Sequence, residues 1–293
     1  RMPTTRDIHF HSGPRLKLSG RLYLPDSARD LHAGAVFCHG FGGVKEGTPV
    51  GLCTALAEAG YTMLSFDYRG FGASEGERAL LLPQEQADDA VAALEYLATQ
   101  VPGLDPQRIG LYGTSFGAGI AALAAVRSPR PRALVASVGV MSGSNWMRSV
   151  HRWYEFRAIQ RRALSAIAHK AATGEIELCE RLDIMSPEPE SLVRYAETTP
   201  ISMETVWHLL HHEPVDHAHR LTMPVFLFGA DDDTVVPCDQ TRQFLDRAHQ
   251  RCRIKRLGNE AARAVRQHRV PGLFLAVGRE HHDRHRRYAG LLL

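Results

Sequence analysis

The stretch RIGLYGTSFGAGIAALAAV, at residues 108–126, joins two apolar patterns of different period across a glycine-rich break. The apolar run before the break predicts the end of a buried strand. After the break, Ile120, Leu123 and Val126 share one face of a predicted helix. The chain must therefore turn sharply from strand to helix within five residues, Gly-Thr-Ser-Phe-Gly.

Ser115 stands at the centre of this turn, with Gly113 and Gly117 two residues away on either side. A side chain at either glycine would clash between the strand and the helix. We expect Ser115 to adopt a strained backbone conformation that holds its hydroxyl out of the turn. The alternative interpretation is an ordinary strand-to-helix turn. The strand–turn–helix context favours a serine nucleophile.

Composition is that of a globular protein, with 44% hydrophobic and 23% charged residues. The length of 293 residues allows one large α/β domain with an insertion, or two small domains. No stretch approaches the ~20 apolar residues that cross a bilayer, and no secretion signal is recognised. The five cysteines include no C-x-x-C pair, so we expect buried free thiols and a cytoplasmic protein.

Charge is distributed unevenly along the chain. Residues 247–293 hold twelve Lys and Arg against three acidic residues, although the net charge of the whole chain is only +3. A basic segment can contact nucleic acid, but no aromatic stacking residues or known binding motif accompany this one. We therefore expect neither a nucleic-acid nor a membrane partner. The oligomeric state stays open, with a dimer as one option.

Strands and helices alternate along most of the sequence, which predicts an α/β fold with a mostly parallel central sheet and helices on both faces. The first two strands alternate polar and apolar residues as an antiparallel pair does. Strands are predicted at residues 6–12, 15–25, 33–40, 61–70, 108–112, 132–141, 222–237 and 252–257, the last of these ending the sheet. Helices are predicted at residues 49–60, 83–100, 116–126 and 239–250.

Residues 143–220 interrupt this alternation and contain all three tryptophans. Helices are expected there at residues 147–172, 191–198 and 202–213. We interpret the segment as a helical cap inserted into a core made of residues 1–142 and 221–293. Such a cap could shape an apolar pocket, although ordinary helix packing explains the same aromatic residues.

The sequence HGFGG, at residues 39–43, directly follows a predicted strand. Ligands of open parallel sheets bind at the carboxyl ends of the strands. The backbone N–H groups of Phe41 and Phe116 are therefore the predicted oxyanion donors beside Ser115. The alternative for residues 39–43 is a flexible glycine loop.

Four motifs in this order resemble the α/β-hydrolase superfamily, in its serine esterase and peptidase-like branch with a helical cap. The resemblance spans about residues 20–258 and rests on HGFGG, FDYRGFGASEGE (66–77), GTSFG and FGADDDTVVP (228–237). It implies hydrolysis of esters, amides or thioesters without a cofactor. Serine at the turn disfavours the members whose nucleophile is aspartate. For Asp67, Arg69 and Ser74 the resemblance implies a structural role.

The acid of such a site is expected after the strand PVFLFGA, where three aspartates compete. Asp233 fits the family's spacing to Pro237 best, whereas counting forward from Gly229 favours Asp232. Mutual repulsion among adjacent carboxylates leads us to expect only one of them to face the base. We take Asp233 as the predicted acid.

The base is harder to assign, because the loop after the predicted strand at 252–257 lacks the family's Gly-His. His268 is the nearest downstream histidine and is our predicted base, with His281, His282 and His285 as alternatives. One hypothesis is that the residues beyond about 259 differ from the family's usual ending because the reading frame shifts. The histidine clusters lack the ligand spacing of a zinc site, so no metal is predicted.

These assignments predict a serine hydrolase with catalytic residues Ser115, Asp233 and His268. It would cleave a small carboxylic ester, or a related amide or thioester, through an acyl-enzyme on Ser115. Peptidase and thioesterase activities share this chemistry. The competing hypothesis is a binding protein of the same fold that lacks a functional histidine.

Overall fold

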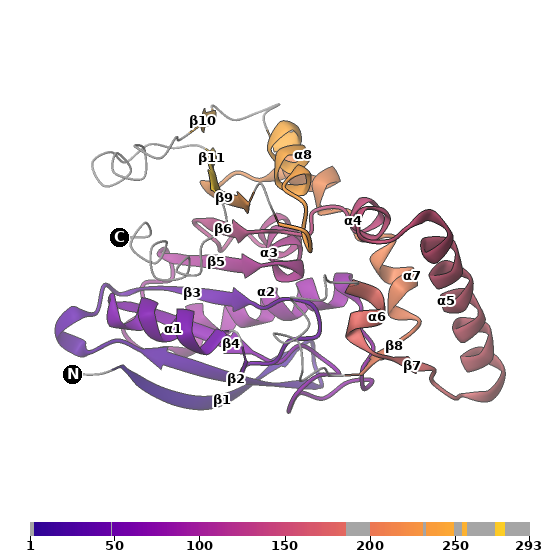
Figure 1. Cartoon of the computed structure of the whole chain (residues 1–293). Coiled ribbons are helices and arrows are strands. Elements are labelled where there is room, and N and C mark those ends of the chain that lie inside the picture. The colour runs from indigo at the N-terminus through magenta and orange to yellow at the C-terminus, as the bar shows by residue number, and fades with distance from the viewer. Residues whose placement is uncertain are drawn as a thin grey trace.

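The computed structural model describes residues 3–47, 49–185, 200–230 and 233–248, together with the backbone of residues 254–256 and 273–278. Within these residues, nine strands form a central sheet in the order β1-β2-β4-β3-β5-β6-β9-β11-β10 (Figure 1). The strands are β1 (Thr4–Ser12), β2 (Leu16–Leu24), β3 (Ala33–Cys38), β4 (Tyr61–Phe66), β5 (Ile109–Thr114), β6 (Leu134–Ser137), β9 (Val225–Ala230), β10 (Ile254–Arg256) and β11 (Leu273–Gly278).

Most neighbouring strands run parallel. In the central sheet of the described residues, β2 pairs antiparallel with β1 on one side and β4 on the other, and the other pairs are parallel. The inner strands read as short apolar runs such as Ala-Gly-Ala-Val-Phe-Cys, because a parallel sheet is buried on both faces. The predicted antiparallel hairpin and mostly parallel sheet are therefore confirmed.

Helices cover both faces of the sheet. The helices outside the region between β6 and β9 are α1 (Pro49–Glu58), α2 (Pro83–Gln100), α3 (Phe116–Arg127) and α8 (Asp239–Ala248), with a 3-10 turn η1 (Ser27–Arg29) after β2. Helix α1 packs on one face, and α2, α3 and α8 contribute to the core of the other (Figure 1). Helix α2 begins with proline at its first position, where the missing N–H has no intrahelical role.

The prediction that residues 252–257 form the last strand is wrong. Strand β11 follows β10 in the chain and lies between β9 and β10 in the sheet. Its sequence, Leu-Phe-Leu-Ala-Val-Gly, suits an inner parallel strand. Strand β10 therefore lies at the edge of the sheet.

The region between β6 and β9 is largely helical and lies beyond the carboxyl ends of the parallel strands (Figure 1). It contains α4 (Gly143–Val150), α5 (Trp153–Thr173), β7 (Leu178–Cys179), α6 (Arg181–Met185), β8 (Ile201–Ser202), α7 (Thr205–Leu209) and the 3-10 helix η3 (Pro214–Arg220). We call residues 143–220 the insertion. No helix within the described residues is long and apolar enough to cross a membrane.

Two helix predictions in the insertion need correction, and a third, at residues 191–198, lies outside the described residues. The helix predicted at 147–172 is broken between α4 and α5, where Nε2 of His151 lies 2.7 Å from the carbonyl oxygen of Ile184. Arg152 then caps the start of α5, and its N–H donates to the Glu155 carboxylate at 2.9 Å. The helix predicted at 202–213 is α-helical only in α7, since Pro214 begins η3 soon afterwards.

The cysteines in the described residues agree with the prediction of free thiols. Cys38, Cys53 and Cys179 are buried free thiols, and Cys238 is buried as well. Burial raises the pKa of the Cys38 thiol to about 12, so this group stays protonated and unreactive at neutral pH. Cys252 lies outside the described residues.

Candidate active site

Ser115 occupies the corner between β5 and α3. Its backbone has φ = 54° and ψ = −130°, a left-handed conformation that is costly for any residue with a side chain. The strain predicted from GTSFG is confirmed. The side chain of Ser115 is partly exposed, and no described residue forms a hydrogen bond with its hydroxyl.

The flanking glycines allow this corner to pack closely. A Cβ atom at Gly117 would overlap the carbonyl oxygens of Cys38 and His39, and one at Gly113 would lie 2.5 Å from the Cα of Ala118. These distances are far below van der Waals contact, so no larger residue fits at either position. Gly117 thus allows the end of β3 to lie against the start of α3, and Gly113 allows β5 to lie against the same turn of α3.

The loop that follows β3, residues 39–47, lies directly beside the nucleophile candidate. We call it the oxyanion loop. A Cβ atom at Gly40 would lie 3.6 Å from the hydroxyl oxygen of Ser115. The backbone N–H of Phe41 donates to no described residue, and neither does that of Phe116, the first residue of α3. A helix leaves its first N–H groups unpaired, so they are available to an anion.

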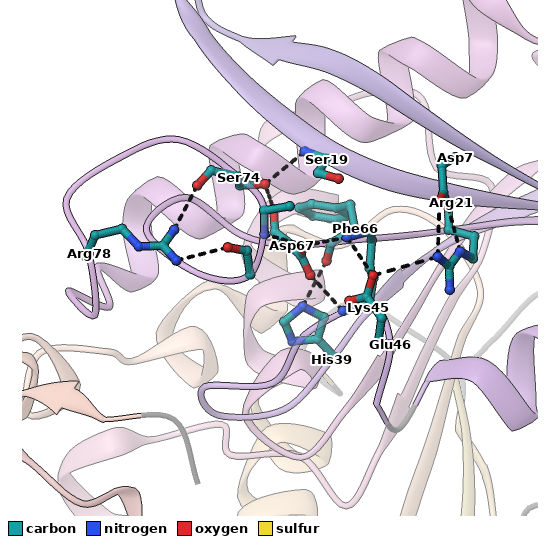
Figure 2. A network of polar contacts seen from close by, with 12 residues as sticks. Asp7, Ser19, Arg21, His39, Lys45, Glu46, Phe66, Asp67, Ser74 and Arg78 are labelled. Carbon is teal, nitrogen blue, oxygen red and sulfur yellow. Dashed lines mark hydrogen bonds and ion pairs between the residues drawn. The ribbon is translucent and has the colours of Figure 1, made fainter. Parts of the chain in front are cut away.

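Buried polar contacts fix the oxyanion loop to β4 and the segment that follows it (Figure 2). Nε2 of His39 lies 2.9 Å from the carbonyl oxygen of Phe66. The Asp67 carboxylate accepts from the N–H of Lys45 at 2.7 Å and from its Nζ at 2.8 Å. Burial lowers the pKa of His39, so its ring is neutral and serves to hold the loop.

The segment 66–77 is itself held by protein groups, in agreement with the structural role implied for Asp67, Arg69 and Ser74. The Ser74 hydroxyl donates to the carbonyl oxygen of Asp67 at 2.6 Å and accepts from the N–H of Ser19 at 2.9 Å (Figure 2). The Arg69 guanidinium pairs with the buried Asp89 carboxylate at 2.6 Å. These contacts connect the segment to β2 and α2.

Asp233 follows β9, two strands along the sheet from β5 and at the same carboxyl edge. Its Oδ1 accepts from the N–H groups of Val235 and Val236, at 3.0 and 2.8 Å. These bonds fix the orientation of the carboxylate. The indole of Trp146, in α4, donates to the carbonyl oxygen of Val235 at 2.7 Å, and thus anchors the same loop.

Residues 30–259 match the family model for the serine aminopeptidases, S33, which covers more than half of the chain. The chain belongs to this α/β-hydrolase family. The match supports the motif order that the sequence predicted, and it ends before His268.

Sequence similarity to known proteins covers most of this α/β-hydrolase. It is 30% identical to a 31.7 kDa protein of Escherichia coli encoded in the traX-finO intergenic region, over 73% of this chain and 77% of that protein. It is 25% identical to the quorum-quenching protein AidA of Acinetobacter baumannii, over 80% of this chain and 81% of AidA. Its fold is similar to that of the α/β-hydrolase GrgF from Penicillium, with a TM-score of 0.73, 19% identity and coverage of 94% and 91% of the two chains.

The structure brings Ser115, Phe41 and Phe116 together at one corner of the hydrolase and places Asp233 at the same edge of the sheet. His268, the predicted base, lies outside the described residues, and so do Asp231 and Asp232. The three alternative histidines, His281, His282 and His285, lie outside them too.

Sequence reasoning missed one buried histidine close to α3. His212 is fully buried, its ring lies 4.7 Å from that of Phe116, and neither ring nitrogen has a partner among the described residues. Burial lowers its pKa to about 3. The ring contacts α3 one turn beyond Ser115, near Gly119. Nothing in the sequence distinguishes it from its neighbour His211, which is exposed.

Two further residues of the insertion reach the site. Trp146 packs against the ring of Phe41, with centroids 6.1 Å apart. Arg181, the first residue of α6, donates from Nη1 to the carbonyl oxygen of Phe41 at 2.9 Å. Both contacts join residues that are far apart in the chain, so spacing alone gives no signal for them.

Proposed function

We propose that this α/β-hydrolase is a serine hydrolase that cleaves a carboxylic ester through an acyl-enzyme on Ser115. The observation that carries the proposal is the strained, partly exposed Ser115 with Gly40 against its side chain. Backbone strain of this kind persists where the surrounding structure enforces it, and it is concentrated at functional sites.

In the proposed reaction, the Ser115 oxygen attacks the carbonyl carbon of the ester while His268 takes the hydroxyl proton. The N–H groups of Phe41 and Phe116 bind the oxygen that becomes negatively charged. His268 then gives its proton to the leaving alkoxide as the carbon–oxygen bond breaks. Water, deprotonated by the same histidine, releases the acid from Ser115. Asp233 holds the imidazole in the required tautomer.

The acyl group of the proposed substrate is apolar. The rings of Phe41 and Phe116 contact edge to face with centroids 5.6 Å apart, and Trp146 joins them. We further propose that the insertion is the helical cap of the enzyme and forms one domain, and that residues 1–142 and 221–293 form the other. Amides and thioesters would react by the same steps and differ only in the leaving group.

A non-catalytic binding protein of the same fold is the second candidate function. The observation that favours it is the absence of histidine from residues 258–262, where the family's base is expected. Such a protein would keep the strained serine and the oxyanion loop but could not activate the hydroxyl.

A fluorophosphonate probe separates the two candidates, because it reacts only with an activated serine. We expect the probe to label the wild-type protein on Ser115, as found by mass spectrometry of the labelled peptide. Ser115→Ala should lose the label entirely. The control Ser165→Ala, at an exposed position on α5, should be labelled like the wild type. A folded wild type that takes no label would favour the binding protein.

The substrate class follows from a second measurement. p-Nitrophenyl esters of increasing acyl length would be compared with the corresponding anilides and thioesters. We expect the esters to have the highest kcat/KM, rising with acyl length as apolar surface is buried.

A further inference from the structure

Arg181 connects the insertion to the oxyanion loop. Its guanidinium donates to the main-chain carbonyl of Phe41 at 2.9 Å, the residue whose N–H is a candidate oxyanion donor. A hydrogen bond from a charged donor is roughly twice as strong as a neutral one. The two residues are 140 positions apart in the chain, so the contact exists only when the insertion is in place.

Residues of the insertion support the oxyanion loop. Gly42 has φ = 63°, and a Cβ atom there would lie 3.0 Å from Cδ1 of Ile201 and 3.3 Å from Cδ of Arg181. The N–H of Gly43 donates to the carbonyl oxygen of Gly40 at 3.1 Å and closes the turn. A turn with glycine on both sides of its apex has unusual backbone freedom, and Arg181 and Ile201 limit that freedom.

Arg181 is itself held in place by its own surroundings. Helix α6 is bound to the end of α4 by the 2.7 Å contact between His151 and the carbonyl oxygen of Ile184, and Ile184 is fully buried. Ile201 lies in β8, which pairs with β7 just before Arg181. The N–H of Ser202 also donates to the carbonyl oxygen of Ala79 at 2.8 Å. The backbone that carries the Arg181 guanidinium is therefore held in place.

We propose that Arg181 is a positioning residue for the oxyanion hole. By holding the carbonyl of Phe41, it fixes the direction of the Phe41 N–H toward the substrate oxygen. Catalysis at Ser115 then depends on the position of the insertion. The catalytic part of this inference rests on the proposed serine hydrolase function, whereas the hold of Arg181 on the loop does not.

Kinetics test the catalytic part. Arg181→Ala should lower kcat on a p-nitrophenyl ester about 10- to 100-fold, because a small misplacement of an oxyanion donor weakens transition-state binding. KM should stay within about twofold, since ground-state contacts are unchanged. Arg181→Lys, which can still donate to the Phe41 carbonyl, should recover part of the loss. The rate of fluorophosphonate labelling should follow kcat.

The matched control is Arg162→Ala, which removes another arginine of the insertion. Arg162 pairs with Glu177 on the surface at 2.6 Å and touches no part of the site. Its kcat should equal that of the wild type. Equal kcat in Arg181→Ala and the wild type would overturn the proposal. A large change in KM alongside the lower kcat, together with lower stability, would also overturn the proposal, since that pattern indicates only a structural role.

Hydrogen exchange tests the hold on the loop without any need for activity. We expect the amide of Gly43 to exchange faster in Arg181→Ala than in the wild type, and at the wild-type rate in Arg162→Ala. Unchanged exchange across residues 39–47 in Arg181→Ala would overturn the inference. If the wild type takes no fluorophosphonate label, the proposed function fails, and the exchange experiment still decides whether Arg181 fixes the loop.

Discussion

The corner at Ser115 and the loop of the proposed acid Asp233, here called the acid loop, lie at the same edge of the sheet but are stabilised differently. At the corner, Ser115 and the oxyanion loop are held by main-chain contacts so close that only glycine fits at Gly113 and Gly117. The acid loop relies on hydrogen bonds from its own N–H groups to Asp233 and on Trp146 from the insertion. The corner therefore depends on close packing between main-chain segments, whereas the acid loop depends on hydrogen bonds, one of which comes from the insertion.

The largest expected effect tests the acid side. Asp233→Asn should lower kcat roughly 10⁴-fold, because the amide leaves the histidine in the wrong tautomer. The amide oxygen can still accept from Val235 and Val236, so the loop keeps its conformation. Steady-state kinetics on the best ester would measure the loss.

Two controls accompany this substitution. Asp239→Asn, an exposed residue at the start of α8, should leave kcat unchanged. If Asp232→Asn abolishes activity while Asp233→Asn does not, the acid is Asp232 and the assignment from motif spacing is wrong.

A smaller effect tests the close packing of the corner. Gly117→Ala should reduce the free energy of unfolding by about 3 kcal/mol, because the new methyl group overlaps the carbonyl oxygens of Cys38 and His39. Urea denaturation followed by circular dichroism would measure it. Gly51→Ala, in α1, has open space around its Cβ position and should stabilise the protein by up to ~1 kcal/mol. Equal unfolding midpoints for Gly117→Ala and the wild type would contradict the tight corner.

The smallest effect concerns His212, which packs behind the corner. Its folded-state pKa of about 3 lies below the ordinary value of 6.5, so between these pH values the unfolded chain binds more protons than the folded one. Stability is therefore complete above about pH 6.5 and falls as the pH is lowered, by about 2 kcal/mol at pH 5 for this residue. His212→Leu should remove that part of the loss, measured by urea denaturation at pH 7 and pH 5.

The control for this measurement is His9→Gln, an exposed position on β1 that should retain the full wild-type loss. Some acid sensitivity should remain in His212→Leu, because burial also lowers the pKa of His39. An unchanged difference between pH 7 and pH 5 in His212→Leu would show that the ring is solvated in the folded protein.

A contrast between local and distant contacts explains what the sequence could predict. The strands, the bounds of α2 and the strained Ser115 follow from residues within a few positions of one another. The break after α4 does not, because it depends on a carbonyl oxygen 33 positions away, at Ile184. The contact of Arg181 with Phe41 spans 140 positions. The sequence analysis did not predict strand β11, because its short apolar run lies between two arginine-rich segments that lack a strand pattern.

The first hairpin of the sheet, β1 and β2, is connected to the candidate active site by hydrogen bonds. The N–H of Lys17 donates to the Glu75 carboxylate at 2.9 Å, and the N–H of Asp67 donates to the carbonyl oxygen of Ser19 at 2.9 Å. Through Asp67, strand β2 is thus two hydrogen bonds away from the oxyanion loop. Protein engineers who shorten this enzyme or graft its active site onto a smaller scaffold would have to carry residues 16–24 along with it.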